Sequence, residues 1–341
     1  MASKREEMSV LVTGGAGYIG SHAVKILIER GYDVVVADNL AKGHREAVHN
    51  DAFFYNVDIA NIDEMTEILR RHDVSDVMHC AAFSYVGESV SLPLNYYENN
   101  TGATTKLLKA MDQAAVKRIV FSSTCATYGE PENLPIVEST EQSPINPYGW
   151  SKLFVEQILK DKQRSDEDFG FIALRYFNVA GSALDGSIGE DHQPETHIIP
   201  LVLQTALGQR DHITVFGTDY ATPDGTCIRD YIHVEDLIEA HILAMETQRA
   251  GDARFFNLGI GHGYSVSEVI ESARRVTGLP INVVEGQRRA GDPPELFANA
   301  DLIRSELKWE PRLTDLDEIV GSAWRWFRAN PEGYERLAKL R

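Results

Sequence analysis

The sequence contains little cysteine. Cys80, Cys125 and Cys227 are its only three, and they lie far apart without CxxC spacing. An odd number of scattered cysteines does not form a disulfide framework and is typical of a reducing compartment. The eleven histidines show no HExxH pattern, so neither residue type has the spacing of a familiar zinc site. We therefore expect no bound metal and a cytoplasmic protein.

Long hydrophobic runs and an excess of positive charge are also missing. No stretch approaches the roughly 18 apolar residues of a membrane span, and the N-terminal segment MASKREEMSV lacks the apolar region of a signal peptide. Asp and Glu number 51 against 33 Lys and Arg, for a formal net charge of −18. Because such a chain repels anionic surfaces, we expect no nucleic-acid partner and no membrane partner.

The order of apolar runs and helical patterns predicts the fold. MSVLVTGG and YDVVVADN flank the helical segment YIGSHAVKILIERG, and this alternation continues to FGFIALRYFN through a long helix predicted from Pro93 to Ala115. Near-continuous Val, Ile and Phe strands joined by helices indicate an α/β fold with a doubly wound parallel sheet of the Rossmann type. We predict this domain over residues 8–178 and a smaller C-terminal α/β lobe over 179–341. Whether segments of the lobe return to the main sheet stays open.

A glycine-rich turn follows the first predicted strand. Three glycines stand at three-residue spacing in VTGGAGYIGS: Gly14, Gly17 and Gly20. Such glycines let the backbone approach a pyrophosphate, and the following helix N-terminus offers N–H groups and a partial positive charge. Asp38 closes the second predicted strand, where a carboxylate would accept hydrogen bonds from an adenosine ribose and repel a 2′-phosphate. NAD is therefore the expected cofactor, although Lys42 and Arg45 are near enough to leave NADP open.

A tyrosine and a lysine stand four residues apart in NPYGWSK, at the start of a predicted helix. Tyr148 and Lys152 would lie on one helix face about one turn apart. A nearby ammonium favours a phenolate and lowers the pKa of tyrosine, which makes Tyr148 a candidate acid/base. The spacing alone is more often that of an ordinary exposed pair, so this interpretation depends on the rest of the chain.

Several specific segments occur together in the chain, in this order: TGGAGYIGSH, VGESV, YYENN, YGWSK, RYFNVAG and DGTCIRDYIHVEDL. From Val10 to about Tyr334 the sequence resembles the extended, nucleotide-sugar-modifying branch of the short-chain dehydrogenase/reductase superfamily. It is most similar to the epimerase family that interconverts UDP-glucose and UDP-galactose. The resemblance implies a UDP-sugar substrate, and a homodimer formed through the helices that begin near Pro93 and Tyr148.

The resemblance also implies a mechanism at the sugar C4 atom. Tyr148 would remove the proton of the 4-hydroxyl while the C4 hydride passes to tightly bound NAD, and the 4-keto sugar would be reduced again from its other face. Lys152 would hold the nicotinamide ribose and, together with the positive charge of the nicotinamide, lower the pKa of Tyr148. Thr124, in FSSTCATYG, would hydrogen-bond the sugar hydroxyl at a position where serine is more familiar.

Further cofactor contacts are implied beside Gly14, Gly17, Gly20, Tyr148 and Lys152. They fall mostly at the ends of predicted strands: Tyr18, Ile19, Asp38, Asn39, Asp58, Ile59, Ala81, Ala82, Phe83, Asn99 and Phe177. Asp58 could instead cap the end of a strand. Ser84 stands where many family members carry a lysine near the NAD phosphates, which leaves the strength of NAD retention open.

On the substrate side, the resemblance places Arg229 and Arg289 on the diphosphate, since a planar guanidinium pairs with two oxygens at once. The other implied contacts are to phosphate, uridine and sugar: Asn178, His197, Ile198, Phe216, Asp292 and Leu296. His197 stands where some members have asparagine, and Phe216 could equally belong to the core. Leu296 is intermediate in bulk at a position that borders the sugar, so acceptance of N-acetylated sugars stays open.

Other functions were weighed against the same residues. A nucleotide-sugar 4,6-dehydratase would carry an Asp-Glu pair after Thr124, where this chain has Cys125 and Ala126. A simple NAD-dependent dehydrogenase has no need of the uridine-side motifs, and a non-catalytic NAD sensor would have no reason to keep Thr124, Tyr148 and Lys152. The remaining alternative is a 4-epimerase of another UDP-sugar, either UDP-arabinose/UDP-xylose or UDP-GlcNAc/UDP-GalNAc, and a UDP-uronate also stays open.

Overall fold

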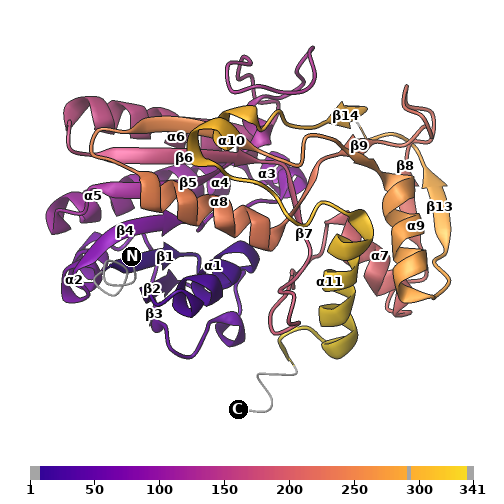
Figure 1. The fold of residues 1–341 in the computed structure, drawn as a ribbon, viewed down its shortest axis with the longest axis horizontal. Coiled ribbons are helices and arrows are strands. Elements are labelled where there is room, and N and C mark those ends of the chain that lie inside the picture. The colour runs from indigo at the N-terminus through magenta and orange to yellow at the C-terminus, as the bar shows by residue number, and fades with distance from the viewer. Residues whose placement is uncertain (1–7, 290–292, 336–341) are drawn as a thin grey trace. The chain divides into compact units, whose positions relative to one another are not determined.

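The computed structural model describes residues 8–289 and 293–335 (Figure 1). Within this range the chain divides into two compact units. The first unit holds the residues up to Glu130 together with Glu138–Arg175 and Ile238–Phe256. The second unit holds Pro131–Val137, Tyr176–Leu237 and the residues from Asn257 on.

A seven-stranded sheet with the order β11-β6-β5-β4-β1-β2-β3 organises the first unit. Its strands are β1 (Ser9–Thr13), β2 (Asp33–Asp38), β3 (Phe53–Asn56), β4 (Val74–His79), β5 (Arg118–Thr124), β6 (Gly170–Tyr176) and β11 (Ala253–Leu258). β1 pairs in parallel with both β2 and β4, and the β2–β3 and β4–β5 pairs are parallel too. The predicted Rossmann-type sheet is confirmed. The chain runs outward from β1 to β3 and then crosses to β4, so the strand order reverses between β1 and β4.

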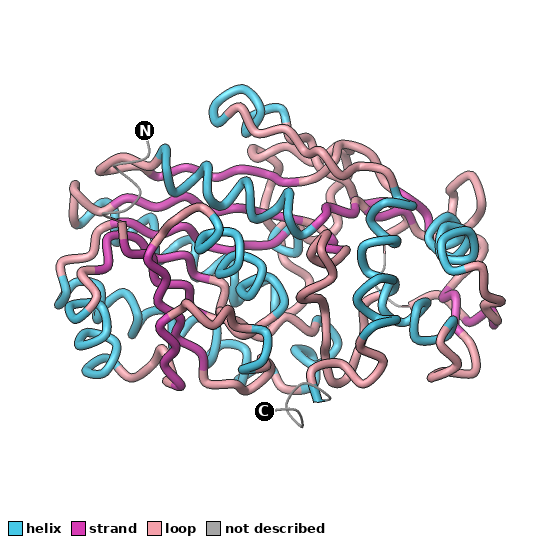
Figure 2. Tube along the Cα trace, turned by 60° about the horizontal axis from the view of Figure 1, so that its bottom comes forward, coloured by secondary structure: helices cyan, strands magenta, loops and turns pink. Residues whose placement is uncertain are grey.

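Helices cover both faces of this sheet (Figure 2). They are α1 (Tyr18–Glu29), α2 (Ile62–Arg71), α3 (Val86–Ser91), α4 (Pro93–Tyr96), α5 (Ala103–Ala114), α6 (Pro147–Ser165) and α8 (Val234–Thr247). On one face, Met65, Leu107 and Val155 of α2, α5 and α6 share a core with Leu11 and Val35 of the sheet. α1 and α8 lie together on the other face, where Arg30, just after α1, pairs with Glu239 of α8. Because both faces are buried, the strands carry apolar residues almost without interruption.

The long helix predicted from Pro93 to Ala115 is interrupted in the structure. A π-helical turn, Tyr97–Gly102, separates α4 from α5. The cause lies in Asn100, which is 2% exposed. Its side-chain amide donates to the carbonyl oxygen of Phe83 at 3.0 Å and to Ser151 Oγ at 2.9 Å. Widening the helix by one residue presents this amide to the chain after β4, and such π turns occur often at functional sites.

Small sheets and four helices build the second unit. The helices are α7 (Ile198–Ala206), α9 (Val266–Thr277), α10 (Asp301–Leu307) and α11 (Leu316–Ala329). The strands are β7 (Asn178–Ala180), β8 (Ile213–Phe216), β9 (Ile228–Arg229), β10 (Tyr231–His233), β12 (Tyr264–Ser265), β13 (Val283–Gly286) and β14 (Glu295–Leu296). Trp309 and Trp326 are among its largest fully buried side chains. Over the described part of the chain, no helix is both long enough and apolar enough to span a bilayer.

A buried histidine links three elements of the first unit. His79, at the end of β4, places Nδ1 2.7 Å from Thr13 Oγ1 and Nε2 2.8 Å from Thr104 Oγ1. Thr104 donates its proton to the carbonyl oxygen of Asn100, so it accepts from His79 Nε2–H, and Nδ1 accepts from Thr13. Burial, helped by the Lys152 ammonium, lowers the pKa of His79 to about 3. The ring is therefore neutral at ordinary pH.

This histidine should make stability depend on pH. An unfolded histidine titrates near pH 6.5, whereas the folded chain protonates His79 only near pH 3, so its stabilisation is complete above pH 6.5 and is lost as the pH falls. Between about pH 6.5 and 4, the free energy of unfolding should fall by about 3 kcal/mol more in the natural protein than in His79→Gln. Urea unfolding measures this difference, with the exposed His212→Gln as control. Equal pH dependence in all three proteins would contradict the assignment.

Candidate active site

Two stretches of backbone meet where the strand order reverses. Gly14 follows β1 with φ of 71°, and a Cβ atom there would lie 2.7 Å from the Cα atom of Ala81, which follows β4. A Cβ atom on Gly20 would lie 2.1 Å from the carbonyl oxygen of Gly14. Only glycine fits at either position. The turn therefore brings bare backbone and the N-terminus of α1 to the carboxyl edge of the sheet, the arrangement that binds a dinucleotide pyrophosphate.

Asp38 at the end of β2 is fixed against this turn. Its Oδ2 atom accepts from the N–H of Ala16 at 3.0 Å, and its Oδ1 atom accepts from the N–H of Leu40 at 2.8 Å. Burial raises the pKa of Asp38, although these two hydrogen bonds lower it in part. A carboxylate has about four acceptor sites, so Asp38 keeps capacity for ribose hydroxyls while it holds the glycine turn.

The two basic residues that left NADP open have other partners. Lys42 Nζ lies 3.9 Å from Glu88 Oε1 and 4.9 Å from the centre of the Tyr85 ring. The Arg45 guanidinium stacks over the Phe54 ring at 4.5 Å. Neither cation is held beside Asp38, an arrangement that favours NAD over its 2′-phosphorylated form.

The predicted adenosine contacts lie beside one another after β2 and β3. Asn39 Nδ2 donates to Asp58 Oδ2 at 3.4 Å, while Asp58 Oδ1 accepts from the N–H of Ala60 at 2.8 Å. Asp58 therefore caps the turn after β3, as in the alternative to an adenine contact. The same turn also places it next to Asn39. Ile59 is buried in the core of the first unit.

Residues Ala81 to Phe83, after β4, are held by an asparagine that the sequence interpretation did not assign. Asn100 Oδ1 accepts from the N–H of Phe83 at 2.8 Å and from Asn99 Nδ2 at 3.0 Å. Asn99 was the predicted contact, and Asn100 positions both it and the loop. The polar Asn-Asn pair inside an otherwise helical pattern was the available signal. Ser84 is exposed.

The predicted catalytic residues come from β5 and α6 and are all buried. Thr124 ends β5, and Tyr148 and Lys152 lie in the first turns of α6. α6 begins here because Pro147 has no N–H to satisfy and Asn146 Oδ1 caps the N–H of Gly149 at 2.9 Å. Tyr148 is 9% exposed and Lys152 only 4%. The pair is therefore not an ordinary exposed helix pair.

Burial dominates the electrostatics of this group. Burial raises the pKa of Tyr148 to about 12, although a hydrogen bond with Thr124 lowers it in part. Lys152 Nζ donates to the carbonyl oxygen of Ser122 at 2.8 Å and lies over the Phe121 ring, and burial lowers its pKa to about 8. That Lys152 and the positive charge of the nicotinamide together lower the pKa of Tyr148 stays a prediction. Desolvation of the phenolate is the largest effect on the pKa of Tyr148, while the ammonium of Lys152 is directed to Ser122.

Within the second unit, two predicted substrate contacts lie against each other. The Arg289 guanidinium stacks over the Phe216 ring at 4.0 Å. Phe216 is 38% exposed, so it does not belong to the core. A flat aromatic face beside a guanidinium suits a base and an adjoining phosphate. Asp292, the predicted ribose contact, lies outside the described residues.

Arg229 and Leu296 are neighbours in the second unit. β9 and β14 pair in parallel, with Arg229 opposite Leu296, and Arg229 Nη1 donates to the carbonyl oxygen of Ile228 at 2.8 Å. Asp230, which the sequence interpretation did not assign, accepts from the N–H groups of Ile260 at 2.9 Å and Ala298 at 3.2 Å. Burial raises the pKa of this carboxyl to about 6. Asp230 thus positions β9 and with it Arg229.

The remaining predicted contacts are placed by β7 and α7. Asn178 opens β7, opposite Tyr231 of β10, and Phe177 before it is buried. Ile198 is the first residue of α7. His197 Nδ1 lies 2.9 Å from Glu190 Oε1 and 3.0 Å from Glu195 Oε1, and these carboxylates raise the pKa of His197 to about 10. This side chain is thus engaged by its own loop, which the sequence interpretation did not foresee.

A glycine turn at the strand reversal and a buried Thr, Tyr and Lys group define a dinucleotide-dependent enzyme of the short-chain dehydrogenase/reductase type. The family model described as "NAD dependent epimerase/dehydratase family" matches residues 10–259. The chain belongs to this family.

Individual relatives cover nearly the whole chain. A UDP-glucose 4-epimerase from Halalkalibacterium halodurans is 52% identical over 96% of this chain and 98% of its own. A crystal structure described as UDP-glucose 4-epimerase superposes with a TM-score of 0.93 at 47% identity, covering 96% of this chain and 99% of the other. The structure of a UDP-glucose 4-epimerase from Bifidobacterium longum, solved in complex with NAD+ and UDP, superposes with a TM-score of 0.91 at 39% identity. The match covers 96% of this chain and 100% of the other.

The glycine turn gives a direct test of the cofactor site. In Gly20→Ala the new methyl group would collide with the carbonyl oxygen of Gly14, so the turn must open and bound NAD should fall at least about tenfold. Nucleotide released on denaturation, per mole of folded protein, measures the loss. The control is Gly87→Ala, because a Cβ atom at this exposed glycine meets nothing within 4 Å. Full NAD content in Gly20→Ala would show that the turn does not contact the cofactor.

Proposed function

We propose that the protein interconverts UDP-glucose and UDP-galactose, using NAD that stays bound through turnover. The observation that carries this proposal is the buried group of Thr124, Tyr148 and Lys152 at the carboxyl edge of the sheet. Support comes from relatives described as UDP-glucose 4-epimerases, one of them 52% identical over 96% of the chain. The reaction is an oxidation at C4 to a 4-keto sugar followed by reduction from the opposite face.

The residues of the first unit divide the chemistry among them. Bound NAD accepts the C4 hydride and returns it. Tyr148 takes the proton of the 4-hydroxyl and gives it back. Thr124 hydrogen-bonds the same hydroxyl, and its hydrogen bond with Tyr148 already lowers the pKa of the phenol. The buried ammonium of Lys152 adds positive charge next to the developing phenolate and binds the nicotinamide ribose.

The two halves of the chain bind different ligands in this proposal. The domain over residues 8–178 binds NAD through the glycine turn, Asp38 and the segments after β3 and β4. The lobe over 179–341 binds mainly the UDP-sugar, with Arg229 and Arg289 on the diphosphate and Phe216 on the uracil. A chain with a net charge of −18 repels a nucleotide sugar overall, so its anionic groups need such local arginines.

The decisive experiment omits added cofactor. Purified protein receives UDP-galactose without NAD, and NMR follows UDP-glucose, with UDP-arabinose and UDP-GlcNAc in parallel tubes. We expect hexose conversion in the natural protein and a loss of at least about 1000-fold in Tyr148→Phe, which should keep its bound NAD because the change removes one oxygen. Conversion of only a pentose or an N-acetylated sugar, even with NAD supplied, would favour the alternative epimerases. Turnover by Tyr148→Phe near the natural rate would dismiss Tyr148 as the acid/base.

Leu296 is proposed to set the size of the sugar that is accepted. Replacing it with tyrosine adds bulk opposite Arg229 and should lower kcat/KM for N-acetylated UDP-hexoses at least about tenfold more than for UDP-galactose. Steady-state kinetics on both substrates measure the ratio. Leu296→Met serves as the control of similar volume. If Leu296→Tyr lowers both values equally, this residue does not border the N-acetyl group.

Homodimer formation through the helices near Pro93 and Tyr148 is part of the proposal. Apolar side chains are exposed on these segments of the first unit, among them Val90 at 64%, Leu92 at 48%, Leu94 at 76% and Phe154 at 42%. Phe154 lies 5.8 Å from the Tyr97 ring, which joins the side chains of the two segments. Several exposed apolar side chains on these neighbouring segments support association with a second copy.

Charge placed in this patch should separate the subunits. Leu94→Asp introduces a carboxylate at an exposed site, so folding of the single chain should be unaffected. In a dimer interface the same carboxylate would be buried and would oppose association. Light scattering should give twice 38.0 kDa for the natural protein and about 38.0 kDa for the variant at the same concentration. Val284→Asp, at an apolar site of the second unit that is 46% exposed, is the control. A Leu94→Asp protein with unchanged mass would place the interface elsewhere.

A further inference from the structure

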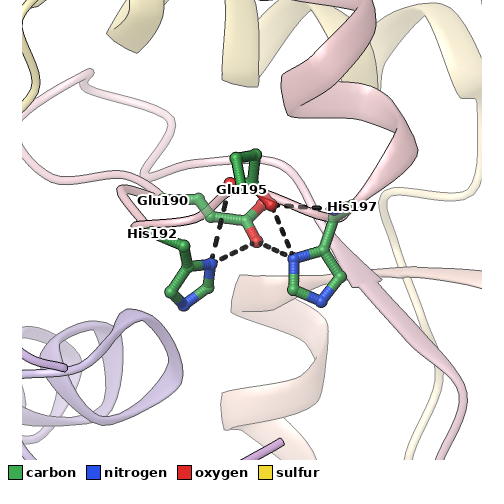
Figure 3. A group of neighbouring side chains, drawn as sticks. All are labelled: Glu190, His192, Glu195 and His197. Atoms are coloured by element: carbon green, nitrogen blue, oxygen red, sulfur yellow. Dashed lines mark hydrogen bonds and ion pairs between the residues drawn. The ribbon is translucent and has the colours of Figure 1, made fainter. Parts of the chain in front are cut away.

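We propose that Glu190, His192, Glu195 and His197 bind one Zn²⁺ ion in the loop that leads into α7 (Figure 3). These residues lie within eight positions of one another, in the second unit. Nothing in the proposed epimerisation uses Glu190, His192 or Glu195. His197 is also a predicted substrate contact, so the site goes beyond that function and shares one residue with it.

The geometry of the four side chains is that of a chelating group. Both imidazole rings turn Nδ1 toward the two carboxylates (Figure 3). His192 Nδ1 lies 3.1 Å from Glu190 Oε1 and 3.7 Å from Glu195 Oε2, whereas His197 Nδ1 lies 2.9 Å from Glu190 Oε1 and 3.0 Å from Glu195 Oε1. Ligands at about 2.1 Å in a tetrahedron are about 3.4 Å apart, within the range of these distances. One ligand atom from each of the four side chains lies within 4.8 Å of the others, so a zinc ion at the centre would draw these atoms closer together.

Charge and burial favour a dication at this place. The side chains of Glu190 and Glu195 are each 4% exposed, and two buried carboxylates so close together need compensating positive charge. In the chain by itself the two histidines face these carboxylates, and a Zn²⁺ ion that displaces the ring protons would supply the same charge with two neutral imidazoles. Imidazole nitrogen suits zinc, whereas Mg²⁺ and Ca²⁺ prefer oxygen ligands throughout, so the mixed set selects a transition metal.

The loop around the cluster is held in place by further hydrogen bonds. Tyr334 exchanges hydrogen bonds with the main chain of Gly189 at 3.1 Å, and its N–H donates to Asp191 Oδ2 at 2.9 Å. Glu195 Oε1 accepts from the N–H of His197 at 2.8 Å. The ligands are therefore oriented before an ion arrives, and such outer contacts strengthen metal sites.

The metal would have a structural role. His197 is the residue just before α7, and its side chain makes no hydrogen bond to the helix. Its side chain belongs to the cluster instead, so the cluster holds the chain where it enters α7. The sequence lacks CxxC and HExxH spacing and therefore predicted no metal. The pattern here is Glu-x-His-x-x-Glu-x-His, which brings four ligands together only through the fold of the loop.

The test uses the full chain without a histidine tag. After removal of metal with EDTA, equilibrium dialysis and elemental analysis should find one zinc per chain, bound with submicromolar affinity and raising the Tm. His192→Gln should weaken zinc binding at least about 100-fold, and Glu190→Gln should behave alike. His212→Gln, an exposed histidine of the same unit, should bind zinc like the natural protein. Mg²⁺ should not compete.

A second measurement covers the case in which a variant fails to fold. Co²⁺ added to the natural protein should give the intense visible absorption of a tetrahedral site, and added zinc should abolish it. The proposal is overturned if the natural protein takes up no zinc, if it binds zinc only at millimolar concentration, or if folded His192→Gln and His212→Gln bind it equally. The four side chains would then be an internal ion-pair network.

Discussion

The structure depends on the close contact between the turn after β1 and the chain after β4. Gly14 and Gly20 allow this contact because neither has a Cβ atom to occupy the space. Asp38 then ties the end of β2 to the same turn, and the neutral His79 ties the end of β4 to Thr13 of β1. Three strand ends are thus joined by hydrogen bonds at one edge. A ligand that needs several backbone N–H groups in a fixed arrangement finds them there.

Burial, which stabilises the fold, also determines the protonation states at this edge. Desolvation raises the pKa of Tyr148 and lowers the pKa values of Lys152 and His79, because each charged form loses water. The hydroxyl of Thr124 and the carbonyl oxygen of Ser122 replace part of that water. A phenol with a pKa near 12 remains protonated until positive charge is added beside it. The acid/base function of Tyr148 is therefore coupled to cofactor binding in our proposal.

In this acidic chain, several charged side chains are held by specific neighbours. Arg289 is held by stacking over Phe216, and Arg229 lies in a short strand positioned by the buried Asp230. Glu190 and Glu195 face two histidines. In each case a charge that is unfavourable alone is stabilised by a specific neighbour. Local arrangement, and not net charge, therefore decides where anions and cations bind.

The sequence by itself determined the sheet, the glycine turn and the Tyr148 and Lys152 spacing, because these follow from apolar runs, helical periodicity and residue spacing within short segments. The π turn at Tyr97–Gly102, the role of Asn100 and the exposure of Phe216 were decided only by tertiary contacts. So were the direction of the Tyr148 pKa shift and the cluster at Glu190. Local periodicity determines which element forms, whereas desolvation and side-chain pairing depend on groups that are distant in sequence and become neighbours only when the chain folds.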